Sequence, residues 1–184
     1  MQLSATLSTL ALAIALGTSS IAANAQVMVG GAAMFAAKNI VENAVNSKDH
    51  TTLVAAVGAA GLVDTLKSAG PFTVFAPVNA AFDALPAGTV PTLLKPENKG
   101  MLAGILTYHV VAGNLDTFTL GQQVAAGGGK AMLKTVAGGT LIVSASGKDM
   151  IVTDEKGGVA VVTTANVYQS NGVIHVIDKV MLPK

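Results

Sequence analysis

The chain has 184 residues, with 11 Lys and Arg against 10 Asp and Glu, a formal net charge of +1 and only 11% charged residues. A typical soluble domain has about 25% charged residues, and here hydrophobic residues reach 51%. This composition excludes a disordered chain and a basic nucleic-acid-binding protein, and the length predicts one domain. The sequence contains no cysteine, which excludes disulfides, thiolate metal sites and cysteine nucleophiles.

Residues 1–25 have the features of a secretory signal peptide. Residues 10–16 form an unbroken apolar run, and no charged side chain occurs before Lys38. The run is too short for a transmembrane helix, which needs about 20 residues, and the Ala-Asn-Ala before Gln26 has the A-x-A form of a cleavage site. We therefore expect a secreted (periplasmic or extracellular) mature chain without a transmembrane helix. The alternative is an N-terminal helix that the mature protein retains.

Helical spacing dominates the first part of the domain. From Lys38 to Ser68 apolar residues recur at intervals of three and four, which predicts short helices with Asp49 as the N-cap of the second. Residues 72–76 are β-branched and aromatic and are bounded by prolines, which predicts a strand. Asn79 is placed to cap a helical turn over 80–85, and another helix is expected over 96–107.

The second half of the chain is predicted to consist of strands and turns. The helix over 96–107 leads directly into a strand at 108–111. The later strands, separated by glycine-containing turns, are expected over residues 131–136, 140–145, 150–153, 159–163 and 173–182. Both faces of the last strand are apolar, so we expect it to be central and buried on both sides. Helices followed by strands predict an α+β fold with a largely antiparallel sheet.

Two segments about a hundred residues apart resemble the signature blocks of the fasciclin (FAS1) domain family. The first reads FTVFAPVNAAF over residues 72–82, the second reads SNGVIHVIDKVMLP over residues 170–183, and Tyr108-His109 between them matches the tyrosine–histidine motif of the family. The signature positions that we expect to be mainly structural are Phe72, Thr73, Phe75, Pro77, Asn79, Phe82, Asn171, Gly172, His175 and Asp178. The resemblance implies a β-wedge of about seven strands with flanking short helices. It places the fasciclin domain at 38–184, after a linker over 26–37 that is either free or packed on the domain.

The resemblance also implies a secreted, non-enzymatic protein that mediates cell adhesion or other extracellular interactions. Its partner would be a cell-surface or extracellular-matrix protein or glycan. In animal members the tyrosine–histidine motif is associated with adhesion, so Tyr108 and His109 are the candidate binding residues. Residues 165–169 read ANVYQ where the family has an acidic residue for integrin contact. A contact that needs a carboxylate to meet a metal ion is therefore not expected at this position.

The three histidines invite a metal or catalytic interpretation, but their spacing supports neither. His50, His109 and His175 form no His-x-His or His-x-x-x-His pair, and no carboxylate cluster accompanies them. His175 alternates with apolar residues on a strand and is expected to be a hydrogen-bonded core residue. His109 lies beside Tyr108 at a helix-to-strand junction, where both a structural and a direct binding role remain open. We expect no metal and no cofactor.

A hydrolase triad can be drawn from Ser170, His175 and Asp178, but the sequence argues against it. His175 and Asp178 are three positions apart and would face opposite sides of one strand, and no Gly-x-Ser-x-Gly motif is present. We therefore expect no enzymatic activity. The alternative to partner binding is a carrier that holds a lipid or another apolar small molecule, and an apolar pocket of about 300 Å³ or more would favour it.

Overall fold

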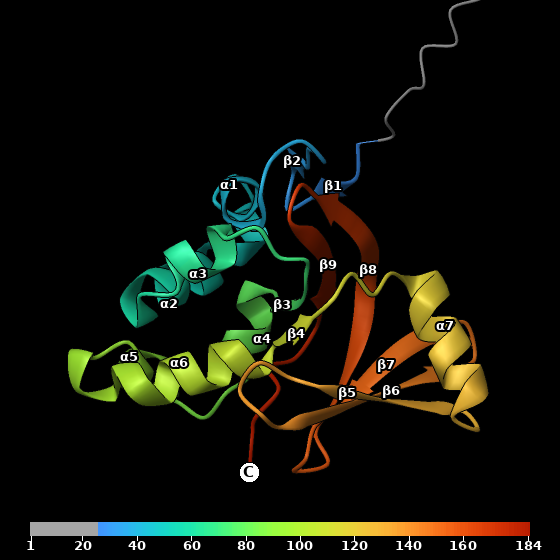
Figure 1. Ribbon diagram of the computed structural model, residues 1–184. Coiled ribbons are helices and arrows are strands. Elements are labelled where there is room, and N and C mark those ends of the chain that lie inside the picture. Colours follow the sequence, from blue (N-terminus) through green and yellow to red (C-terminus); the bar gives the residue numbers. More distant parts are fainter. Residues whose placement is uncertain (1–25) are drawn as a thin grey trace, which may run out of the picture.

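A computed structural model describes residues 26–184 of the protein, so the expected signal peptide lies outside the described residues. The strands are β1 (Met28–Val29), β2 (Ala32–Ala33), β3 (Phe72–Pro77), β4 (Val110–Ala112), β5 (Lys130–Lys134), β6 (Thr140–Ser146), β7 (Asp149–Thr153), β8 (Val159–Gln169) and β9 (Gly172–Ile177). β1 and β2 form a hairpin, and the other seven form one sheet in the order β4-β3-β9-β8-β7-β6-β5. A bridge between Val111 and Thr135 links the two edges, so the sheet is nearly closed (Figure 1).

The sheet is antiparallel apart from the β3–β9 pair, which is parallel. Every residue of β9 is buried between β3 and β8, which confirms the predicted central strand. The strand ends at Ile177 and not at Leu182 as predicted. Beyond it, side chains replace strand partners, because Met181 N–H donates to His109 Nε2 (2.9 Å) and Leu182 N–H donates to Asp154 Oδ2 (3.0 Å).

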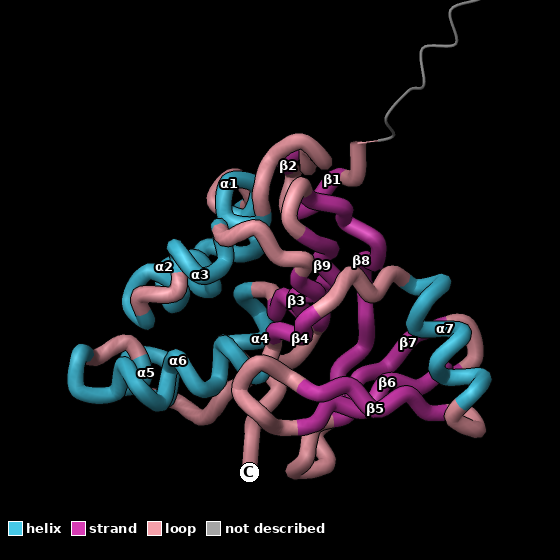
Figure 2. Tube along the Cα trace, viewed as in Figure 1, coloured by secondary structure: helices cyan, strands magenta, loops and turns pink. Residues whose placement is uncertain are grey.

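The helices lie in two places on the sheet. In the described residues they are α1 (Ile40–Ala44), α2 (Thr51–Ala60), α3 (Val63–Lys67), α4 (Asn79–Asp83), α5 (Thr89–Leu93), α6 (Lys99–Tyr108) and α7 (Thr117–Ala126), with short 3-10 helices at Lys48–His50 and Pro96–Asn98. Figure 2 shows α1 to α6 together on one side, while α7 lies apart from them beside β5, β6 and β7. The predicted α+β architecture is therefore confirmed.

The prediction of strands and turns alone after residue 113 is wrong, because α7 occupies ten residues there. Asp116 caps this helix by accepting a hydrogen bond from Thr119 N–H at Oδ1 (2.8 Å). Leu120 and Val124 lie one turn apart and are buried, so the helix is held by packing on the sheet. The predicted strand at 108–111 also begins too early, since Tyr108 is the last residue of α6 and β4 starts at Val110.

The predicted N-caps are corrected by a long-range contact. Asp49 lies inside the 3-10 helix before α2, and α4 begins after Val78 without a side-chain cap. Asn79 instead caps α2, because its Oδ1 accepts hydrogen bonds from Thr52 N–H (3.0 Å) and from the Thr51 hydroxyl (3.2 Å). The polar side chain that satisfies the start of α2 thus comes from the first residue of α4, 27 residues later in the chain.

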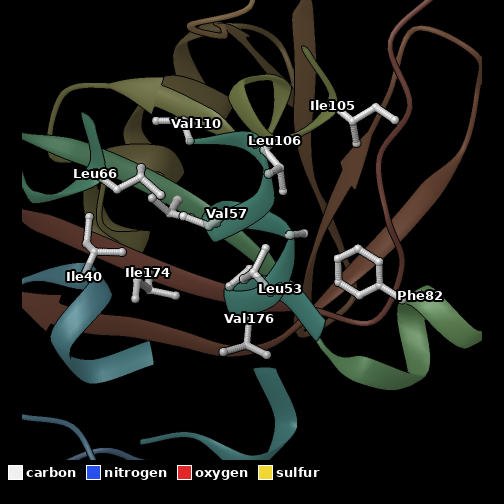
Figure 3. Packing of buried hydrophobic residues seen from close by; sticks show 14 of the residues in the cluster. Ile40, Leu53, Val57, Leu66, Phe82, Ile105, Leu106, Val110, Ile174 and Val176 are labelled. Carbon is white, nitrogen blue, oxygen red and sulfur yellow. The ribbon is translucent and has the colours of Figure 1, made fainter. Parts of the chain in front are cut away.

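Two hydrophobic cores hold the fold. One lies between the sheet and the α1 to α6 layer, where Ile40, Leu66 and Ile174 come from α1, α3 and β9 (Figure 3). Val29 and Met34, from the segment 26–37 that carries the β1–β2 hairpin, are buried in the same core. The other core lies between α7 and the inner side of the sheet and contains Phe75, Tyr108, Leu120, Leu141, Val143, Val152 and Ile177.

Candidate functional site

Tyr108 ends α6 with its side chain completely buried. Its hydroxyl donates to the carbonyl of Thr140 (2.8 Å) and accepts from the N–H of Glu155 (3.1 Å). Burial raises the pKa of Tyr108 above its ordinary value. Gly139 must lack a side chain here, because a Cβ at that position would lie 2.5 Å from the Tyr108 ring. The ring therefore fastens the turn after β5 and the turn after β7 to the end of α6.

His109 follows at the C-cap of α6 and is also buried. Its Nδ1–H donates to the Ile105 carbonyl (2.8 Å), and its Nε2 accepts from Met181 N–H (2.9 Å), so the ring is neutral with both nitrogens occupied. Burial lowers the pKa of His109 to about 4. Tyr108 and His109 are adjacent, but a partner at the protein surface would touch neither ring.

Asn171 and Gly172 join β9 to the helices. Asn171 Oδ1 accepts from Ile40 N–H (3.1 Å), and its Nδ2 donates to the carbonyls of Leu66 (2.7 Å) and Ser68 (2.9 Å). One amide thereby fixes the start of α1 and the end of α3. At Gly172 an added Cβ would overlap the carbonyl oxygen of Phe72, so glycine permits the close approach of β3 and β9.

The structure separates the residues of the imagined triad. His175 Nε2–H donates to the Leu115 carbonyl (2.8 Å), its ring stacks on Phe75 with centroids 5.6 Å apart, and burial lowers its pKa. Asp178 Oδ1 accepts from Val161 N–H (2.7 Å), while Ser170 is exposed. These three side chains do not converge, so they form no hydrolase triad.

The side chains of the first signature block also make structural contacts inside the protein. The buried Thr73 hydroxyl donates to the Gly113 carbonyl (2.7 Å) and accepts from Leu115 N–H (2.9 Å), which fixes the segment between β4 and α7. Pro77 ends β3, Phe82 is buried, and Phe72 is half-buried at the edge of the helical core.

A cavity of about 360 Å³ lies in the first core, between the sheet and the helices. Its wall is formed mainly by apolar side chains of α1, α2, α3, α6, β1, β3, β4, β8 and β9. Figure 3 shows Ile40 from α1, Leu53 and Val57 from α2, and Leu106 from α6 around this part of the core. The volume falls within the range of about 300–1,000 Å³ found for small-molecule sites.

His50 is the most unusual polar residue of the cavity wall. Its Nδ1 is hydrogen-bonded to the Ser47 hydroxyl (2.9 Å), but its buried Nε2 has no hydrogen-bond partner within residues 26–184. Burial lowers the pKa of His50, an effect that the nearby Ala76 carbonyl opposes. The ring is therefore neutral near pH 7, and its Nε2 is enclosed by the protein.

The described residues contain no convergence of three His, Cys, Asp or Glu side chains suited to a metal ion. In the same part of the chain, no helix has the length and apolar character needed to cross a bilayer.

Comparison with known proteins now identifies the fold. The sequence model of the fasciclin domain matches residues 48–183. The chain belongs to the fasciclin family. This fasciclin-domain protein is 48% identical over 157 residues to the protein sll1483 of Synechocystis sp., covering 85% of this chain and 79% of that protein. It is 33% identical over 159 residues to the cell surface glycolipoprotein MPB83 of Mycobacterium bovis, covering 84% of this chain and 64% of MPB83.

The solved structure of a FAS1 domain pair from the insect cell adhesion molecule fasciclin I has the same fold. The TM-score is 0.71 at 16% identity, over 79% of this chain and 51% of that two-domain chain. The α+β FAS1 fold expected from the signature blocks is therefore confirmed, and the fasciclin domain spans about half of the fasciclin I pair. Fasciclin-domain proteins are generally non-catalytic, in agreement with the use of the histidines described above.

Sequence reasoning missed two residues of this framework. Asp154 is buried, and its Oδ1 accepts hydrogen bonds from Lys156 N–H (2.9 Å) and Gly158 N–H (2.7 Å). Its Oδ2 accepts a hydrogen bond from Leu182 N–H (3.0 Å). The available signal was the sequence DEKGG, in which an aspartate before glycines is typical of a turn. His50 was examined only as a metal ligand, and no sequence pattern marks a lone histidine as part of a cavity wall.

Proposed function

We propose that this fasciclin-domain protein is a secreted, non-enzymatic binding protein whose partner is a protein or glycan at the cell surface or in the extracellular matrix. The observation that carries the proposal is the outer face of strands β5 to β8. In register, Met132 lies opposite Ile142, and Ile151 lies opposite Val161. All four side chains lie on the same face of the sheet. On this face Met132 is 74% exposed.

The opposite face of the same strands supports this interpretation. Leu133, Val143 and Val152 point inward and are buried in the core beneath α7. The packing of this inner face against α7 stabilises the sheet. Apolar side chains on the outer face are then available for contact, and a partly exposed apolar patch is typical of an interaction site. The printed descriptions of MPB83 and fasciclin I, a cell surface protein and a cell adhesion molecule, agree with an extracellular role.

The test compares two methionines that are similarly exposed on different elements. Labelled protein is applied to intact cells of the producing organism and to its isolated extracellular matrix, and bound protein is quantified. Met132→Glu on β5 is expected to weaken binding at least tenfold, because a carboxylate would be desolvated at the contact. Met101→Glu on α6, where the methionine is 63% exposed, should remain within twofold of wild type. Absence of binding, or an equal effect of both variants, contradicts the proposal.

The export part of the proposal has its own measurement. We propose that residues 1–25 are removed as a signal peptide and that the mature chain begins at Gln26. Intact-mass spectrometry of the protein isolated from the periplasmic and extracellular fractions should give the mass of residues 26–184. A protein found only in the cytoplasm with residues 1–25 still attached would contradict export by this route.

A second candidate function, that of a small-molecule carrier, is favoured by the cavity in the helical core. At about 360 Å³ it exceeds the 300 Å³ at which an apolar pocket begins to resemble known ligand sites. The two functions use different surfaces, since the cavity is lined on the sheet side by β3, β4, β9 and Val167 of β8, whereas the outer face is formed by Met132, Ile142, Ile151 and Val161 on β5 to β8.

A further inference from the structure

The second signature block contains the one Asn-Gly pair of the chain, Asn171-Gly172, where β8 turns into β9. We propose that Asn171 is a site of spontaneous deamidation, protected in the folded protein and exposed by unfolding. We propose further that deamidation removes the contacts by which Asn171 holds α1 and α3, so that the modified chain folds far less stably. This covalent modification is independent of both candidate functions.

The reaction needs only the chain and water. The backbone nitrogen of Gly172 gives up its proton and attacks the side-chain carbonyl carbon of Asn171. The bond from that carbon to Nδ2 breaks, Nδ2 takes up a proton and leaves as ammonia, and a succinimide ring remains. Water then opens the ring at one of its two carbonyls and gives aspartate or isoaspartate. Glycine favours the attack, because it has no Cβ beside the nitrogen and its backbone rotates freely.

The folded protein holds both reacting groups in place. The Asn171 side chain is 6% exposed and makes three hydrogen bonds to backbone groups of α1 and of the end of α3. The peptide group between Asn171 and Gly172 is fixed as well, since its carbonyl accepts from Phe72 N–H (3.0 Å), and Gly172 is buried. Attack requires the amide to leave its partners and a base to reach the buried nitrogen, so the reaction awaits opening of the structure.

Aspartate at position 171 does not replace the amide. Its carboxylate still accepts from Ile40 N–H, but both donated hydrogen bonds are lost. At neutral pH a negatively charged oxygen faces the carbonyls of Leu66 and Ser68. The bond to Leu66 is buried, so water does not compensate for its loss, and the end of α3 loses its contact with β9.

Isoaspartate damages the sheet instead. It routes the backbone through the former side-chain carbon, which inserts an extra backbone atom directly before Gly172. Gly172 pairs with Phe72 on β3 and with Gln169 on β8, and it approaches Phe72 so closely that a Cβ would overlap the carbonyl oxygen. Because both faces of β9 are buried, its register is strongly specified, and the longer backbone does not fit it.

The first test follows deamidation across the unfolding transition. The protein is incubated at mildly alkaline pH in a series of guanidinium chloride concentrations and digested with pepsin at acid pH, and peptide mass spectrometry gives the deamidated fraction of each asparagine. The rate at Asn171 should rise at least about tenfold from buffer to full unfolding and follow the unfolded fraction measured by circular dichroism. A rate that ignores denaturant, or rises before the fold is lost, overturns the protection.

Asn46 serves as the control within the same samples. It is exposed and is followed by Ser47, not by glycine. In the unfolded chain Asn171 should convert faster than Asn46, because only Asn171 precedes a residue without a Cβ. In buffer Asn171 should convert no faster than Asn46, because only Asn171 is buried. An unfolded chain in which Asn171 is not the faster of the two overturns the site.

The second test measures the effect on folding. Chains kept unfolded for increasing times are diluted to pH 7 and to a guanidinium concentration at which the unmodified protein is just folded. Size exclusion then separates folded from unfolded chains. Aspartate and isoaspartate at position 171 should be depleted at least about tenfold from the folded fraction, whereas deamidated Asn46 should be shared evenly. Equal proportions of the position-171 products in both fractions overturn the loss of stability.

Discussion

Asn171 gives the sharpest test of how this fold is held together. Asn171→Ala removes one acceptor and two donated hydrogen bonds, leaving Ile40 N–H and the carbonyls of Leu66 and Ser68 without their partner. The bonds to Ile40 and Leu66 are buried, and each buried backbone group left unpaired costs about 1–3 kcal/mol. Ser68 is exposed and can turn to water. We therefore expect the free energy of unfolding to fall by about 4 kcal/mol, a large part of the roughly 5–15 kcal/mol of a typical domain.

Urea unfolding followed by circular dichroism measures this change, with two companion variants. Asn171→Asp keeps the size and the acceptor for Ile40 N–H but turns a carboxylate oxygen toward the carbonyls of Leu66 and Ser68. It should be at least as destabilised at pH 7 and should recover toward acid pH, where protonation restores one donor. Asn46→Ala removes an exposed bond to the Glu42 carbonyl and should change stability by less than about 0.5 kcal/mol. A loss below about 1 kcal/mol for Asn171→Ala would refute the reasoning.

Three other changes follow from the same structure. Tyr108→Phe removes the hydroxyl between Thr140 and Glu155 and should lower the free energy of unfolding by about 1–3 kcal/mol in urea; Tyr108→Ala and His109→Ala should cost more, and variants that lose binding but unfold like wild type would show that these residues act at an interface. The pKa of His109 is about 4 in the folded protein and about 6.5 in the unfolded chain, so the unfolded chain takes up the proton first as the pH falls. The contribution of His109 to the free energy of unfolding is therefore complete above pH 6.5 and decreases by up to about 3 kcal/mol as the pH drops to 4. In His109→Gln this part of the pH slope should be absent from urea midpoints measured between pH 7 and 4, and an unchanged slope contradicts the assignment. Gly172→Ala should lose more than about 2 kcal/mol through overlap with Phe72, whereas Gly100→Ala, on the open face of α6, should gain about 0.4–1 kcal/mol in thermal melts.

The fold class could be predicted because its signals are local or concentrated in signature blocks. The apolar run of β9 identified a central strand, and its burial on both faces is observed. The helix α7 was missed because its sequence, TFTLGQQVAA, begins with β-branched and aromatic residues and has Gly121 in its middle, which lowers helix propensity. The spacing of Leu120 and Val124 was the available signal. Their burial against the sheet decides the conformation there.

Capping failed as a prediction for a different reason. Asp49 and Asn79 were each assigned to the nearest helix start in the sequence, which is the correct assumption for a local cap. The start of α4 lies beside the start of α2 in space, so Asn79 reaches Thr52 across 27 residues. No single-sequence pattern records that proximity. The cavity escapes prediction in the same way, because its volume is the space left between helices and strands that are separate in the sequence.

The signature side chains share one physical role that explains how a chain without cysteine holds this fold. Asn79, Asn171 and Thr73 each bind backbone groups of elements distant in the sequence, and His109 and His175 do the same with ring nitrogens that burial keeps neutral. These contacts fix the ends of helices and the junctions between layers, where backbone groups would otherwise be unsatisfied. Their polar atoms are therefore occupied within the protein. His50 departs from this pattern, since its hydrogen bond to the Ser47 hydroxyl stays within three residues of the chain. Its side chain lines the cavity between the helices and the sheet, which is the place where a carrier of this fold would hold a ligand.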